Sequence, residues 1–271
     1  QGTLACCQCS NPRGIFPQEK RILDKFYRSE AMRGRAPLSK VPLCARCPSA
    51  QGGGAKPIDA AHRLCQPVRM SHDPMILILA AGASSRMRGA DKLLQPIDGI
   101  PQIARIAKAA IATGKAVIIA LPADHPGRKR AVADLQATAL TVEDASEGMA
   151  ASIRAGVALV KGACGLMILP ADMPDLEADD LRAVLRAFMA APSAILRATS
   201  ASGEPGHPVM FPADLFADLA RIKGDEGARA ILKQHRSRLR TIPLSGQRAT
   251  TDLDTPEDWA IWRATRTQPP A

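Results

Sequence analysis

The chain has 271 residues, enough for one large or two small domains, and its 46% hydrophobic residues are enough for a sizeable core. Its net charge of +10 suggests nucleic-acid binding, but residues 1–70 carry 12 Lys/Arg against 4 Asp/Glu, whereas residues 71–271 carry 24 against 22. Aromatic residues are only 3%, no apolar run reaches the ~18 residues of a membrane span, and no signal-peptide pattern is present, so we expect a cytoplasmic enzyme that binds neither nucleic acid nor membrane.

Residues 1–73 differ in composition from the remainder. They are rich in Pro, Arg, Ser and Gly, lack apolar periodicity and hold six of the seven cysteines: Cys6, Cys7, Cys9, Cys44, Cys47 and Cys65. Zinc binding is one interpretation, but the CxC and CxxC pairs lie about 35 residues apart, a spacing that fits no compact zinc module, and disulfides are not expected in a cytoplasmic enzyme. We favour a disordered or non-native extension, since the chain does not begin with Met and Met70 or Met75 would suit as its start.

The stretch Met75–Lys92 opens the second part of the chain, residues 74–271. Residues 75–80 are almost wholly apolar, which predicts a strand buried on both faces. The small residues 81–85 follow, where a ligand can approach the backbone N–H groups, and then the cations Arg86, Arg88 and Lys92. Each cation about 4 Å from a phosphate charge contributes on the order of 4 kcal/mol, so this arrangement suits a polyphosphate. The alternative is a buried strand followed by solvated basic residues, because neither GxxxxGK[ST] nor GxGxxG is present.

Strands and helices then alternate to the end of the chain. Asp98-Gly99 predicts a turn, and a helix from Pro101 keeps apolar residues at helical spacing until Gly114 caps it. Further strands are expected at 116–121, 140–142, 165–169, 194–199 and 239–244, further helices at 128–135, 148–160 and 178–190, and an irregular loop at 203–211. The spacing of about 20–30 residues predicts a single doubly wound, Rossmann-like α/β domain.

Carboxylates mark a candidate metal site. Asp172 follows the apolar run 165–169, and the carboxyl end of a buried parallel strand is where open α/β sheets bind ligands. One carboxylate with phosphate oxygens and waters is the usual way to hold Mg²⁺; the alternative is that Asp172 only forms a turn. We interpret Asp175 as the N-cap of the next helix.

A helix start is also predicted near the C-terminus. Thr255 as the cap, Pro256 at the first position and Asp258 at the third helical position form a capping arrangement. It leaves Asp252 and Asp254 available for another role. Trp259 and Trp262 are expected to pack this helix onto the body.

The loop sequence resembles a known family signature. Leu79–Met87, LAAGASSRM, with Lys92 following, is similar to the LA(A/G)GxSxRMG…K signature of the nucleotidyltransferases of molybdenum cofactor biosynthesis. The resemblance extends from Met75 to near Arg263, with Arg88 in place of the usual Gly. The family has cytidylyl and guanylyl branches, and both join a nucleoside monophosphate to molybdopterin and release pyrophosphate.

The resemblance implies roles for individual residues. Asp172 resembles the metal-binding Asp of GDMP, with Ala171 in place of Gly, and Asp254 precedes Thr-Pro, as a second metal ligand does in related nucleotidyltransferases. The segments GHPV and GDxGAR imply that His207 and Arg229 bind the acceptor substrate. The alternatives are that His207 only shapes a loop and that Arg229 lies on a solvated helix face. Of the family's GMSxS, Ala150 replaces the first Ser and only Ser152 offers a hydroxyl. The expected nucleotide-binding residues are Leu79, Ala80, Ala81, Gly82, Ser84, Ser85, Arg86, Lys92 and Ser152, and the catalytic residues are Arg86, Lys92 and Asp172.

These expectations define a Mg²⁺-dependent transfer of CMP from CTP to molybdopterin. Ala81 favours the cytidylyl branch, although the length of the RMxGxDK loop is typical of the guanylyl branch and GTP. A sugar-phosphate nucleotidyltransferase shares the fold, but the GHPV and GDxGAR segments argue against it. A non-catalytic molybdopterin carrier that delivers the cofactor to a molybdoenzyme is the alternative from another class.

Overall fold

The computed structural model describes residues 73–224 and 227–267. The six N-terminal cysteines with their zinc interpretation lie outside these residues, as does Asp225 of the GDxGAR segment. The division into an extension over residues 1–73 and a domain over 74–271 therefore stays a prediction. Within the described residues, no helix has the length and apolar character needed to cross a bilayer.

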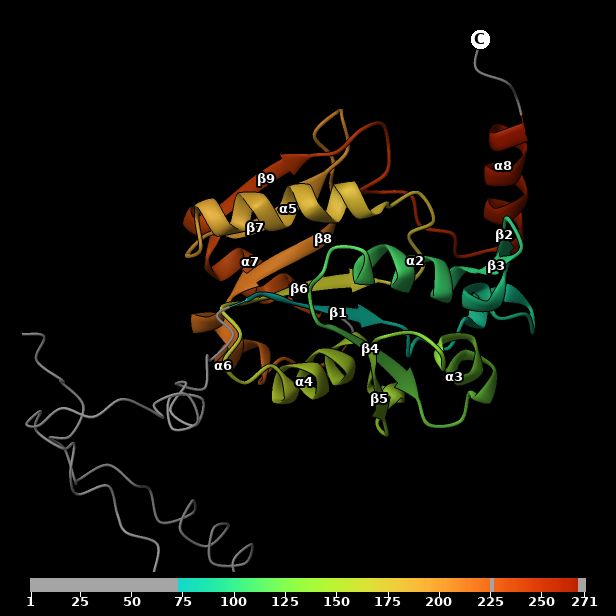
Figure 1. Cartoon of the computed structure of the whole chain (residues 1–271), viewed down its shortest axis with the longest axis horizontal. Helices are drawn as coiled ribbons and strands as arrows, with labels where there is room; N and C mark the ends of the chain where they lie inside the picture. The colour runs from blue at the N-terminus through green and yellow to red at the C-terminus, as the bar shows by residue number, and fades with distance from the viewer. Residues whose placement is uncertain (1–72, 225–226, 268–271) are drawn as a thin grey trace, which may run out of the picture. The chain divides into compact units, whose positions relative to one another are not determined.

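A seven-stranded sheet forms the centre of the described domain (Figure 1). Its strand order is β5 (Thr138–Val142), β4 (Val117–Pro122), β1 (Met75–Leu79), β6 (Gly165–Pro170), β8 (Pro205–Pro212), β7 (Ile195–Thr199) and β9 (Leu239–Pro243). The pairs β5–β4, β4–β1, β1–β6 and β7–β9 are parallel, and β8 is antiparallel to both neighbours. The predicted α/β class is confirmed, with a sheet that is mostly parallel.

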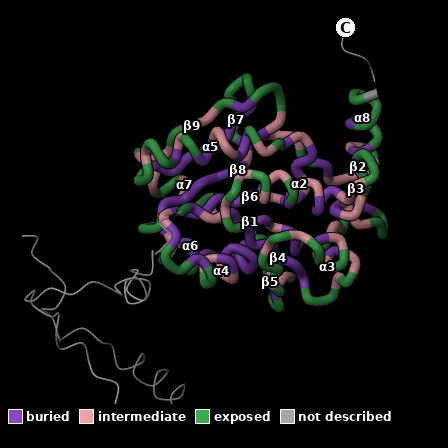
Figure 2. The backbone as a smooth tube through the Cα atoms, in the orientation of Figure 1, coloured by how far each residue is buried: buried purple, intermediate pink, exposed green. Residues whose placement is uncertain are grey.

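Helices cover both faces of this sheet. α2 (Gln102–Ile111) and α5 (Ala178–Ala190) pack on one face, and α4 (Met149–Leu159), α6 (Phe216–Leu219) and α7 (Arg229–Gln234) on the other. The remaining elements are α3 (Pro126–Val132), α8 (Pro256–Thr267), the hairpin β2 (Pro96–Ile97) and β3 (Ile100–Pro101), and five 3₁₀ turns, Ser85–Met87, Lys92–Leu94, Ala145–Glu147, Ala213–Leu215 and Arg236–Arg238. Successive residues of β1 alternate between the faces, Ile76 and Ile78 toward α2 and Leu77 toward α4, so both faces are buried (Figure 2).

The C-terminal helix α8 stands beside the hairpin β2–β3 at one edge of the domain. Trp259 and Trp262 pack edge to face, with centroids 5.9 Å apart, in a small cluster with Met87, Ile97 and Leu253. The Thr255 hydroxyl accepts from the Asp258 N–H at 3.1 Å and the Asp258 carboxylate accepts from the Thr255 N–H at 2.8 Å, so the predicted cap is confirmed.

Two local predictions are wrong. Residues 205–211, expected to be an irregular loop, belong to β8, because the ladder resumes at Val209 after the prolines and the pairing with β7 shifts register between Arg197 and Thr199. The N-cap of α5 is Glu177, whose N–H donates to the carboxylate of Asp180 at 2.9 Å. Asp175 instead accepts from the Trp262 indole at 3.0 Å, a contact across 87 residues that local sequence does not reveal.

The topology brings the predicted site residues to one edge of the sheet. Leu79, the last residue of β1, pairs with Pro170, the last residue of β6, so the loop after β1 and Asp172 start side by side. The chain continues from β1 toward β4 and β5 on one side and returns to β6 on the other, which makes this edge a switch point where open α/β sheets bind ligands. Because β8 runs antiparallel to β6, its first residues, including His207, reach the same edge.

The approach of β8 to the segment after β9 generates a stability prediction. A Cβ on Gly206 would lie 1.8 Å from the Ala249 carbonyl oxygen, so the backbone must move in Gly206→Ala. We expect this variant to lose about 3 kcal/mol of unfolding free energy by urea denaturation. Gly246→Ala, at φ +57° with open space around it, is the matched control and should lose about 1 kcal/mol. Equal losses in both variants would contradict the packing argument.

Candidate active site

A cleft of about 780 Å³ opens at this edge of the sheet. The predicted site residues that line it are Leu79, Ala81, Gly82, Ser85, Arg86, Lys92, Ser152, Asp172, His207, Arg229 and Asp254. Ser84 lines an adjoining recess of about 170 Å³, together with Gly82, Lys92 and Asp254. Ala80 is fully buried beneath the loop. The structure thus gathers residues that are more than 170 positions apart at the extremes around one cavity, while their individual roles stay predictions.

Lys92 lies between the two carboxylates predicted to bind metal. Its Nζ is 2.5 Å from Asp172 Oδ2 and 2.7 Å from Asp254 Oδ1, and Arg86 contacts the other oxygen of Asp254 at 2.7 Å. Burial alone would lower the pKa of the Lys92 ammonium, but the charges and hydrogen bonds of Asp172 and Asp254 raise it above its usual value. Two cations and two carboxylates therefore balance each other at this end of the cleft.

A third carboxylate, that of Asp252, also lines the cleft. Partial burial raises its pKa, and the negative charges of Asp254 and Asp172 raise it further. A negative charge on Asp252 is therefore disfavoured beside the other two carboxylates. Sequence analysis left Asp252 without a role.

The acidic pair fits a divalent cation. Carboxylate oxygens of Asp172 and Asp254 approach one point, the Lys92 ammonium, from two different segments, and oxygen is the donor that Mg²⁺ prefers. No group of three or more His, Cys, Asp or Glu side chains within the described residues is arranged to hold a metal by itself. This donor set suits an ion that shares its coordination with phosphate oxygens and waters.

Arg128 of α3 holds the loop that follows β1 from behind. Its guanidinium donates to the carbonyl oxygens of Ala80 and Gly82, to the Ser84 hydroxyl and to both carboxylate oxygens of Asp91. Ser84, at φ 52°, thus directs its hydroxyl into this network. Sequence analysis missed both Arg128 and Asp91, and nothing in the local pattern around residue 128 signals a contact 46 positions away.

The opposite wall is the start of α4. Gly148 at φ 86° precedes the helix, and Ser152 is almost fully buried where it meets the cleft. The first N–H groups of an α-helix have no partner within the helix itself. The N–H of Ala150 is partly engaged, since it lies 3.4 Å from the Gly224 carbonyl oxygen.

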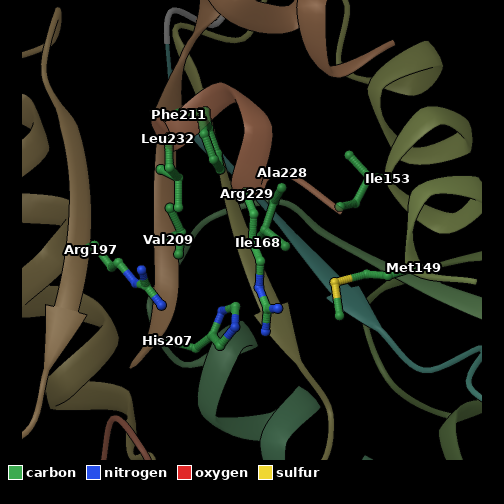
Figure 3. Close-up of a pocket in the computed structure, with 10 residues that line it drawn as sticks. All are labelled: Met149, Ile153, Ile168, Arg197, His207, Val209, Phe211, Ala228, Arg229 and Leu232. Atoms are coloured by element: carbon green, nitrogen blue, oxygen red, sulfur yellow. The ribbon is translucent and has the colours of Figure 1, made fainter. Parts of the chain in front are cut away.

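A side chamber of about 90 Å³ extends from the cleft between α4, α7 and β8 (Figure 3). The nitrogen-bearing ends of Arg197, His207 and Arg229 gather at one end of it, and Phe211 and Leu232 lie at the other. Its remaining lining is Met149, Ile153, Ile168, Val209 and Ala228. Arg197 is a further residue that sequence analysis missed, because only the fold places its strand β7 next to β8.

His207 is an uncharged imidazole between two cations. Burial lowers its pKa, and Arg197 and Arg229 lower it further against the opposing effect of Asp172, so that it falls to about 4. The backbone N–H of His207 donates to the Ala249 carbonyl oxygen at 2.8 Å. Its ring Nδ1 is buried and has no hydrogen-bond partner among the described residues. The hydrogen-bonding capacity of this ring nitrogen is therefore unused within the described residues.

The protonation state of His207 can be measured directly. We expect its ring proton resonance to titrate near pH 4 in an NMR titration, where an ordinary histidine titrates near 6.5. Arg197→Gln should raise the pKa of His207, because it removes a neighbouring positive charge. A midpoint near 6.5 in the unmodified protein would contradict the buried, cation-flanked environment.

Comparisons with known proteins agree with this geometry. The MobA-like NTP transferase domain matches residues 76–239. The purine catabolism protein PucB of Bacillus subtilis (strain 168) is 29% identical over 198 residues, which cover 69% of this chain and 94% of PucB. The crystal structure of Rv0371c from Mycobacterium tuberculosis H37Rv is 27% identical with a TM-score of 0.63, covering 72% of this chain and 100% of that one.

A second structure of Rv0371c, in complex with manganese, is 26% identical with a TM-score of 0.57 and covers 70% of this chain and 96% of that one. The family predicted from the loop signature is confirmed by these matches. The matched domain spans every strand of the sheet up to the start of β9, and with it the loop, Lys92 and Asp172. The chain belongs to the MobA-like NTP transferase family and is a nucleotidyltransferase.

Proposed function

We propose that the protein transfers CMP from CTP to the molybdopterin cofactor and releases pyrophosphate. The observation that carries the proposal is the single cleft that combines a small-residue loop, the cluster of Lys92 with Asp172 and Asp254, and the cationic side chamber. The first two features suit a triphosphate, and the third suits an anionic acceptor.

The chemistry requires charge neutralisation more than a base. A terminal phosphate oxygen of molybdopterin, already anionic, attacks the α-phosphorus of CTP, and the bond to the β-phosphate breaks with departure of pyrophosphate. The side chains of Arg86 and Lys92 are placed to stabilise the charge on the phosphates, while the loop N–H groups orient them. Ser152 offers a hydroxyl from the opposite wall.

Asp172 and Asp254 are the residues that would hold Mg²⁺. When bound there, the ion would neutralise phosphate charge and polarise a phosphoryl oxygen. The manganese complex of Rv0371c, a relative 26% identical to this chain, supports a divalent cation for the family fold. In the structure the Lys92 ammonium contacts one oxygen of each of these two carboxylates.

The acceptor end is the side chamber. Arg197 and Arg229 supply positive charge, and neutral His207 supplies a hydrogen-bonding nitrogen in a site enclosed by apolar walls. This combination suits an acceptor whose phosphate lies at the junction of chamber and cleft. The preference for cytosine rests on Ala81, which lines the cleft and at which the loop resembles the cytidylyl branch of the family.

The reaction itself is the main test. The full-length protein, incubated with Mg²⁺, metal-loaded molybdopterin and CTP, should release pyrophosphate, and Asp172→Ala or Asp254→Asn should lower the rate by about 100-fold or more. Asp179→Asn, in an exposed carboxylate on α5, is the matched control and should leave the rate unchanged. Pyrophosphate release with GTP alone would support the reaction but contradict the proposed preference for cytosine. Release only with sugar phosphates would contradict molybdopterin as the acceptor. Molybdopterin binding without turnover would favour the carrier.

The acceptor site predicts a separate kinetic effect. Arg229→Gln and Arg197→Gln should each raise KM for molybdopterin by about tenfold, because each removes one cation from the acceptor phosphate. The Kd for CTP in the absence of acceptor should not change, which isothermal titration calorimetry would measure. Equal losses in CTP and acceptor affinity would contradict the division of the cleft.

A further inference from the structure

Arg128 heads the largest fully buried side chains of the described residues, and the chemistry proposed above does not use it. It belongs to α3, but its guanidinium lies behind the loop that follows β1. Its five N–H groups all donate hydrogen bonds. Nε and Nη2 donate to the Asp91 carboxylate at 2.7 and 2.8 Å, and Nη2 also donates to Ser84 Oγ at 2.9 Å. Nη1 donates to the carbonyl oxygens of Ala80 at 2.8 Å and Gly82 at 2.7 Å.

Arg128 does not add a net positive charge beside the loop. The two bonds to Asp91 form a bidentate ion pair, which compensates the burial of the guanidinium. Burial by itself would raise the pKa of the Asp91 carboxyl, but the hydrogen bonds and charge of Arg128 lower it below its usual value. The ion pair is therefore neutral overall, and the remaining effect of Arg128 on the loop is geometric.

That geometric effect follows from the planarity of the peptide bond. In a trans peptide the N–H points opposite to the carbonyl of the same unit. Arg128 holds the carbonyls of Ala80 and Gly82, and the peptide units 80–81 and 82–83 are trans, so the N–H groups of Ala81 and Ala83 point away from the guanidinium. Both residues line the cleft, and no hydrogen bond among the described residues uses either N–H.

We propose that Arg128 is a positioning residue that presents the N–H groups of Ala81 and Ala83 to the triphosphate of the nucleotide. The proposal rests on the function proposed above only in placing the triphosphate against this loop. It is independent of the base and of the acceptor. Without Arg128, the two carbonyl oxygens lose their donors, and no other hydrogen bond among the described residues holds the peptide units 80–81 and 82–83 in this orientation.

Binding of three probes tests the proposal in the full-length protein with Mg²⁺: CTP, GTP and inorganic triphosphate. We expect Arg128→Met to lower the affinity for every probe that the unmodified protein binds by about tenfold or more. The reason is that the Ala81 and Ala83 N–H groups would lose their hydrogen bonds to the charged phosphates. Arg128→Lys should be intermediate, since an ammonium keeps a partner for Asp91 but cannot hold both carbonyls with the same geometry. Val184→Ala, a buried change in α5 away from the cleft, is the control for lost stability.

The amide signals provide a readout that a purely structural role would not move. With ¹⁵N-alanine labelling, inorganic triphosphate should shift the amide resonances of Ala81 and Ala83 in the unmodified protein, and the shifts should disappear in Arg128→Met. If that variant does not fold, a weakening of about threefold or more in Arg128→Lys would support the proposal.

Other outcomes would overturn it. Unchanged triphosphate affinity in Arg128→Met, with a loss of thermal stability like that of Val184→Ala, would leave Arg128 as a structural residue. Unchanged affinity in Arg128→Lys together with unshifted Ala81 and Ala83 amides would do the same. Binding of GTP but not CTP would overturn the proposed base while supporting Arg128 if the variant weakens GTP. No binding of any probe would overturn both proposals.

Discussion

The contact of Lys92 with Asp172 and Asp254 joins three segments that are 80 and 162 residues apart in the sequence. Each segment carries charge that would be unfavourable in the partly buried cleft without its partners. Against the effect of burial, the carboxylates of Asp172 and Asp254 raise the pKa of Lys92, which favours its charged form; together with burial, they also raise the pKa of Asp252, which disfavours its charged form. The cluster also determines what the cleft can receive. A triphosphate and a divalent cation bring opposite charges together, so they can enter as a pair without leaving an uncompensated charge.

The sequence was informative where local chemistry decides the structure. The apolar runs of β1, β4 and β6 were recognisable because strands buried on both faces carry apolar residues at every position. The Thr255–Asp258 cap was recognisable because its donors and acceptors are three residues apart. The loop signature and the position of Asp172 after a strand assigned Lys92 and Asp172 to one predicted site, although not to a direct contact.

The features that were missed or wrong depend on contacts distant in sequence. β8 contains prolines and glycine that argue against a strand, yet two neighbouring strands provide its ladder partners. Asp175 has the composition of a helix cap, but Trp262 of α8 engages it. The sequence around Arg128 gave no sign of its contacts. An arginine on an exposed helix face and an arginine buried against a distant loop can have the same local sequence.

The two ends of the cleft are connected through the segment that follows β9. The carbonyl of Ala249 accepts from the N–H of His207 and lies against Gly206, where no side chain would fit. Five residues later the same segment supplies Asp254 to the cluster with Lys92 and Arg86. The side chamber and the acidic cluster therefore share one short stretch of backbone. A displacement of His207 by a bound acceptor would act on Ala249 first, and the residues between Ala249 and Asp254 include Asp252, whose carboxylate already lies near two others. The distance between His207 and Asp254 is thus constrained by backbone contacts and not by side chains alone.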